Sequence, residues 1–153
     1  MIEWIQNFFS GVIPKLLLNA TLETLYMTFV STALAFILGL VLAIVLILTR
    51  SGGLCENRII YAVLDVAINT LRSFPFIILL IVLFPLTKLL IGTSIGTTAA
   101  IVPLTIGSAP FIARLIESAL LEVDSGVIEA AKSFGASKTQ IIFRVMFVEA
   151  LPS

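Results

Sequence analysis

The chain has 153 residues, of which 59% are hydrophobic and only 12% are charged, so it is far more apolar than a soluble domain that fills one core. Nine basic residues balance nine acidic ones without any basic tract, which argues against a nucleic-acid partner. With one cysteine, Cys55, and no histidine, the chain lacks an intrachain disulfide and the commonest general base and metal ligand. We therefore expect an integral protein of the lipid bilayer with no catalytic residue, metal site or cofactor.

Residues 1–20 are expected to form an N-terminal segment outside the membrane or in its interface. Glu3 precedes any basic residue, and the apolar run that follows is too long for a signal-peptide core, so we expect no cleaved signal. The aromatic side chains of Trp4, Phe8 and Phe9 suit a membrane interface.

The first membrane span is predicted at residues 24–49, which contain no charge. A helix of this length exceeds the hydrocarbon core of about 30 Å. Small residues recur at every fourth position along it and so share one face, where a neighbouring helix can approach closely. We interpret this stripe as helix packing; it consists of Ser31, Ala35, Gly39 and Ala43.

The second and third spans are predicted at residues 66–87 and 91–113, separated by a short turn at Lys88. Gly92 and Gly96 form a GxxxG pattern at the start of the third span, which we assign to helix packing. Residues that weaken a helix follow in the same span, which predicts a kinked helix facing the protein interior: Pro103, Gly107 and Pro110.

The distribution of basic residues predicts the orientation of the spans. Arg50 and Arg58 flank the first loop, and four basic residues follow the third span: Arg114, Lys132, Lys138 and Arg144. Because cytoplasmic loops carry the excess of Lys and Arg, both regions should be cytoplasmic, with the N-terminus outside.

Three polar residues, Asp65, Asn69 and Arg72, share one helix face at the start of the second span. Ionisable residues within a membrane suggest a transport role. However, a span of about 20 residues that ends at Thr87 would place Arg72 only about 6 Å inside the core, within reach of snorkelling. We therefore favour an interfacial or packing role for this stripe over substrate contact, and the substrate residues stay unknown.

Residues 126–133, GVIEAAKS, nearly match the phosphate loop GxxxxGK[ST], with Ala131 in place of the second glycine. The segment favours a helix and follows another helical stretch rather than a strand. We therefore do not expect this chain to bind ATP.

Residues 124–146 predict a helix, a sharp turn and a second helix on the cytoplasmic side. Asp124 or Ser125 can cap the first helix, and Gly135 supplies a left-handed stop. Ser137 and Gln140 form a capping box for the second. By itself this pattern also fits a solvated connector.

The sequence Glu129-Ala130-Ala131, followed by Gly135, resembles the EAA loop of binding-protein-dependent ABC importers. NTLRSFPFIILL, residues 69–80, and AAIVPLTIGSAPFIARLIESALLEV, residues 99–123, look like the permeases of methionine importers. The resemblance implies an all-α transmembrane bundle over residues 21–153, in which Glu129, Ala130, Ala131 and Gly135 dock onto a cytoplasmic ATPase. It also implies two ATPase subunits, a second permease copy and an external methionine-binding lipoprotein.

The family pattern continues for two further spans, so we expect a partial permease with three spans. A Leu-Pro pair expected about twelve residues after the glycine is replaced by Phe147-Val148, and only the later Leu151-Pro152 pair remains, which predicts a longer second helix. The alternatives are a permease for another amino acid or a small peptide, and a structural membrane protein that binds no ATPase. A membrane enzyme is disfavoured because the spans carry no convergent catalytic set.

Overall fold

The structure, a computed structural model, describes residues 12–150, and every secondary-structure element in that range is helical. This confirms the predicted all-α fold. Trp4, Phe8, Phe9 and the Leu151-Pro152 pair lie outside the described residues. The elements in chain order are α2 (Val12–Thr49), α3 (Arg58–Ser73), α4 (Phe76–Ile91), α5 (Thr97–Leu121), α6 (Ser125–Ser133), α7 (Lys138–Gln140), the π-helix η1 (Ile141–Met146) and α8 (Phe147–Ala150).

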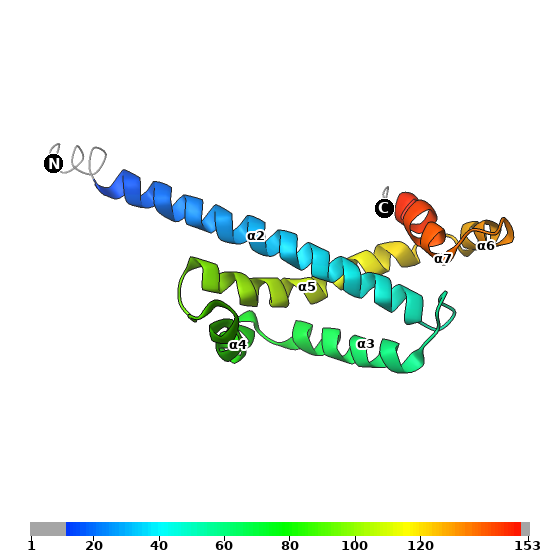
Figure 1. Ribbon diagram of the computed structural model, residues 1–153, viewed down its shortest axis with the longest axis horizontal. Coiled ribbons are helices and arrows are strands. Elements are labelled where there is room, and N and C mark those ends of the chain that lie inside the picture. Colours follow the sequence, from blue (N-terminus) through cyan, green and yellow to red (C-terminus); the bar gives the residue numbers. More distant parts are fainter. Residues whose placement is uncertain (1–11, 151–153) are drawn as a thin grey trace.

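Helices α2 and α5 run side by side and form the centre of the molecule (Figure 1). Both are long and apolar enough to cross a membrane, and the bent pair α3–α4 provides a third crossing if it counts as one span. Helix α2 spans Val12–Thr49, so residues 12–20 of the predicted N-terminal segment are helical and continuous with the first membrane helix.

The predicted stripe of small residues on α2 is buried: Ala35 and Ala43 are 0% exposed and Ser31 is 5% exposed. A Cβ atom added to Gly39 would lie 2.8 Å from Ile112 Cγ2 and 3.0 Å from the carbonyl oxygen of Ala109, both on α5. The stripe therefore lies where α5 approaches α2 most closely, as expected for small residues between membrane helices.

The predicted second span, residues 66–87, is wrong as a single helix. Helices α3 and α4 meet at an angle of 114° on either side of the Phe74-Pro75 step. Proline lacks a backbone N–H and disfavours a helical conformation in the residue before it. Phe74 accordingly adopts extended backbone, with φ −77° and ψ 134°. The chain therefore changes direction in the middle of the apolar run.

The assignment of Gly92 and Gly96 to helix packing also needs correction. Gly92 ends α4 with φ 86°, and Gly96 precedes α5 with φ 116°. Such φ values favour glycine because a Cβ atom would strain the backbone. These glycines shape the turn between the helices, and the third helix runs over Thr97–Leu121 instead of 91–113. Two prolines lie inside it and are buried, Pro103 and Pro110.

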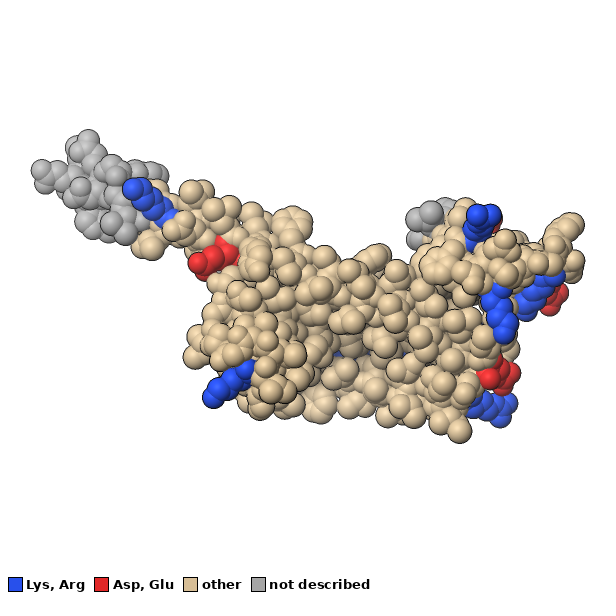
Figure 2. Space-filling view, in the orientation of Figure 1, with Lys and Arg blue, Asp and Glu red and all other residues tan. Residues whose placement is uncertain are grey.

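Charged side chains gather at the two ends of the molecule, and the face between them is almost entirely apolar or uncharged (Figure 2). The end of α2, the start of α3 and helices α6 and α7 lie at one of these ends (Figure 1). The loop at 50–57 and the EAA-like segment therefore share one side of the molecule, as the sequence predicted.

Candidate functional site

Helix α6 carries the EAA-like residues and has a defined start and stop. Asp124 caps its first turn, because the carboxylate accepts the Gly126 N–H at 2.6 Å. At its other end the Gly135 N–H donates to the Lys132 carbonyl at 2.9 Å, and the Ala136 N–H donates to the Ala131 carbonyl at 3.1 Å. Gly135 has φ 77°, so the left-handed stop predicted from the sequence is present.

The second helix begins at the predicted capping box. The Gln140 N–H donates to Ser137 Oγ at 3.3 Å, and the Ser137 N–H donates to Gln140 Oε1 at 2.8 Å. The helix then widens into the π-helix η1, Ile141–Met146, before α8 resumes the ordinary pitch. A π segment of this kind frequently marks a functional position, and no local pattern in the sequence indicated it.

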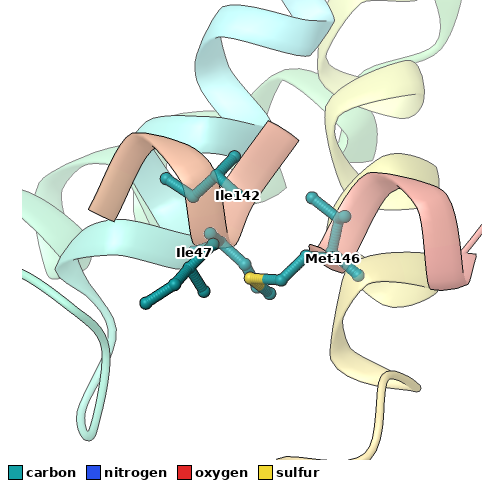
Figure 3. Packing of buried hydrophobic residues seen from close by; sticks show 5 residues of the cluster. Ile47, Ile142 and Met146 are labelled. Carbon is teal, nitrogen blue, oxygen red and sulfur yellow. The ribbon is translucent and has the colours of Figure 1, made fainter. Parts of the chain in front are cut away.

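A buried apolar cluster attaches this helix pair to the membrane helices. Ile142 and Met146 of η1 pack with Ile47 of α2 (Figure 3), and Leu120 of α5 belongs to the same cluster. Ala131 is partly buried against this cluster. The last alanine of the EAA-like sequence therefore contributes to internal packing, and its predicted docking role stays a prediction.

Several residues of α6 are exposed, and the three that we name the docking face are Glu129, Ala130 and Phe134, the residue that caps the end of the helix. All three are exposed, and Phe134 is 91% exposed, the highest value among the large hydrophobic residues described. Sequence reasoning did not select Phe134. The sequence feature that could have identified Phe134 is a large apolar side chain directly before the stop glycine, where a solvated connector would be expected to carry a polar residue.

Of the three residues in the polar stripe on α3, only Asp65 and Asn69 interact with each other. The Asn69 side-chain amide donates to Asp65 Oδ2 at 3.2 Å, and Asp65 forms an ion pair with Arg114 of α5. Arg114 also pairs with Glu117 at 2.6 Å, and Glu117 is 4% exposed. Arg114 was expected beyond the end of the third span, but it lies inside α5, where it pairs with Glu117 of the same helix and links α3 to α5 through Asp65.

Arg72 stands apart from this network. Its guanidinium lies over the ring of Phe111 on α5, 6.0 Å from the centroid, and no ion pair of Arg72 occurs within residues 12–150. Because α3 begins at Arg58 and not near Ile68, Arg72 is about 21 Å along the helix. Arg72 thus lies in the last turn of α3 with an exposed side chain, and its depth in a membrane stays a prediction.

Residues 50–153 match the model of a protein family described as binding-protein-dependent transport system inner membrane component. The chain belongs to this family. The family description names an inner membrane component, in keeping with the two helices of residues 12–150, or three if the bent pair is one span, that are long and apolar enough to cross a membrane.

Among relatives, the chain is 54% identical to the probable D-methionine transport system permease protein MetI of Vibrio cholerae, over 90% of this chain and 61% of that protein. It is 49% identical to the D-methionine transport system permease protein MetI of Escherichia coli, over 90% and 63%. The chain thus spans less than two thirds of the length of these relatives.

Two solved structures resemble the fold. The inward-facing MetNI methionine ABC transporter, in its native crystal form, superimposes with a TM-score of 0.88 and 48% identity, over 92% of this chain and 65% of that chain. An amino acid ABC transporter crystallised with histidines gives a TM-score of 0.64 and 25% identity, over 99% and 63%.

Proposed function

We propose that this chain forms part of the translocation pathway of an ATP-driven importer for methionine. The substrate is supported by relatives named as D-methionine permeases and by the fold shared with the MetNI transporter. In this proposal two copies of the permease assemble with two cytoplasmic ATPase subunits. An external methionine-binding lipoprotein delivers the substrate.

The observation that carries the proposal is the docking face of α6. A short helix with a cap at Asp124 and a stop at Gly135 presents an exposed aromatic residue beside an alanine and a carboxylate. Aromatic anchors with small neighbours that permit close approach are typical of the energetic centre of a protein interface. The docking face is attached to α2 and α5 through the cluster around Ile47, so motion of a bound ATPase can reach the membrane helices.

The experiment is to replace Phe134 with Ser in the assembled permease and to measure co-purification of the ATPase and uptake of methionine. We expect a loss of about tenfold or more in association, because a buried aromatic anchor contributes 2 kcal/mol or more, by rough estimate, to an interface. The control is Ile95→Ser, which changes an exposed apolar residue, 85% exposed, between α4 and α5. Unchanged ATPase association and uptake in Phe134→Ser would contradict the proposed docking face.

The proposed orientation places the docking face in the cytoplasm and the N-terminus outside. Cys55 is exposed in the loop between α2 and α3, and Lys138 Nζ lies 3.2 Å from its sulfur. We expect a membrane-impermeant thiol reagent to label Cys55 only after cells are permeabilised. An Ile95→Cys variant in a Cys55→Ser background should be labelled in intact cells. Labelling of Cys55 from outside would reverse the orientation.

A further inference from the structure

We propose that Arg72, together with the aromatic cavity at the break between α3 and α4, binds the carboxylate and the apolar side chain of the transported amino acid. This inference rests on the proposed function, because it assigns a binding site to the substrate of that importer. It requires three features in one place: an unpaired positive charge, a cavity, and apolar surface suited to the rest of the ligand.

The charge comes from Arg72. The Arg72 side chain is exposed at the break of the bent helix pair α3–α4. A guanidinium in an apolar membrane segment is costly unless it faces a partner or water, and intramembrane charges therefore mark substrate pathways by default. The neighbouring Arg114 is already paired with Asp65 and Glu117. Arg72 has no carboxylate partner within residues 12–150, only the face of Phe111. Its guanidinium is left with donors for an anionic group, and carboxylates match that geometry.

The cavity lies beside this guanidinium. It has a volume of about 240 Å³ and an apolar and aromatic wall. A second cavity, of about 220 Å³, shares Arg72 and Phe111 with the first and has no acidic residue in its lining. The residues of the first cavity on which the argument depends are Arg72, Phe74, Phe76, Leu79, Gly107 and Phe111.

The break between α3 and α4 is what creates the cavity. Pro75 turns the chain away, which separates Phe74 from Phe76, and both rings line the space beside α5. Gly107 leaves space on the α5 side of the cavity, because a Cβ atom there would lie 3.2 Å from Leu79 Cδ2 and 3.3 Å from the Phe76 ring. Discontinuous helices commonly form substrate sites in transporters.

The lining selects the class of ligand. Three phenyl rings and two leucines favour a long apolar side chain, and a thioether makes favourable contacts with aromatic edges. Arg72 selects a free carboxylate at the other end of the ligand. A zwitterionic amino acid with an unbranched, sulfur-containing side chain meets both requirements, whereas an amino alcohol of the same shape lacks the anionic group.

The test uses photo-methionine, whose side chain carries a diazirine, on the assembled importer in its own membrane. We expect crosslinks within residues 71–79 and 107–111. Excess methionine should suppress these crosslinks, and methioninol, which lacks the carboxylate, should not. Arg72→Gln should reduce the labelling about tenfold or more, since hydrogen bonds to a charged group are the stronger kind. The matched control is Arg58→Gln on the same helix, whose side chain is 84% exposed and should not affect labelling.

Two further variants separate binding from assembly, which is followed by co-purification of the ATPase. Arg72→Lys keeps the charge and should restore part of the labelling. Phe111→Leu keeps the charge and should weaken labelling while assembly stays normal. Crosslinks elsewhere, equal competition by methioninol, or normal labelling in Arg72→Gln and Phe111→Leu would overturn the inference. If wild-type membranes import no methionine, the proposed function itself is wrong. If they import methionine but the crosslinks lie elsewhere in the chain, only the proposed binding site is wrong.

Discussion

The contact between α2 and α5 differs sharply from the contacts of α3 and α4. On α2, Ala35, Ala43 and Leu46 are 0% exposed, and α5 buries nine residues along its length. Helix α3 has a single buried residue, Ile68, and α4 has two. The first contact is apolar and close because small side chains let the backbones approach; the second is open and contains an ion network and two cavities.

This difference assigns separate roles to the two regions. Close-packed apolar interfaces move as units, whereas an open contact with polar groups has room to rearrange. The coupling region is attached to the close-packed pair, because the cluster with Ile142 and Met146 includes Ile47 of α2 and Leu120 of α5. An ATPase that moves α6 would therefore displace α2 and α5 together and change their spacing from α3 and α4.

The largest effect is expected from Arg114→Ala, which removes the polar link between α3 and α5. It leaves the carboxylates of Asp65 and Glu117 without their partner, and Glu117 is 4% exposed. Breaking a buried pair in this way costs about 3–5 kcal/mol. Thermal unfolding of the purified protein would measure the loss. The matched control is Arg58→Ala, whose pair with Glu56 is exposed and contributes roughly 0–1 kcal/mol. Equal stability of the two variants would show that the ion network does not hold α3 in place.

A pair of alanine substitutions tests the difference in packing directly. In Gly39→Ala the new Cβ would meet Ile112 Cβ at 2.9 Å and the Ala109 carbonyl oxygen at 3.0 Å, which leaves little room to adjust. Overpacking of this kind costs about 1–3 kcal/mol. In Gly107→Ala the nearest atoms are the end of the Leu79 side chain and the Phe76 ring, which can shift. We expect Gly107→Ala to unfold at nearly the wild-type temperature. A larger loss of stability in Gly107→Ala than in Gly39→Ala would show that α4 and α5, and not α2 and α5, form the close-packed pair.

The turn after α6 is expected to show a smaller energetic effect with a clear functional consequence. Gly135→Val strains a residue at φ 77° by about 1–2 kcal/mol, although no atom lies within 4 Å of the added Cβ. Gly52 has the same φ and the same free space, so Gly52→Val carries the same strain in the loop between α2 and α3, outside α6 and its stop. Both variants should reach the membrane in similar amounts, and only Gly135→Val should lose ATPase association and uptake. If both lose them equally, backbone strain alone is responsible.

The smallest effect is expected from Glu129→Ala. Glu129 is exposed and has no ion pair within residues 12–150, so the free energy of unfolding should change little. It lines a cavity of about 250 Å³ together with Arg50 and Lys132. ATPase association should weaken by a factor of about five at most, as expected for an exposed charge at an interface rim. A loss as large as in Phe134→Ser would place Glu129 at the centre of the interface.

Local patterns in the sequence were enough to predict much of this molecule. The uncharged run at 24–49 identified a membrane helix, and the stripe through Ala35 and Ala43 identified its packing face, since both follow from helical periodicity. Gly135 and the Ser137 capping box were also predicted, because caps depend on neighbouring residues alone. The EAA-like sequence and the other segments that carry the family resemblance are also short stretches of local sequence.

Other features depended on residues far apart in the chain. Apolar composition cannot reveal whether a run is one helix or two, so the turn at Pro75 was missed although the proline itself was visible. The ion pair of Asp65 with Arg114 joins positions 49 apart, and the stacking of Arg72 on Phe111 depends on how α3 packs against α5. The sequence by itself determined the first membrane helix and the caps of the helix pair after α5, because those features are local. Only the tertiary structure decided that Ala131 packs against the buried cluster, that Phe134 is exposed and that Arg72 lines a cavity beside Phe111, because burial depends on which helices pack together.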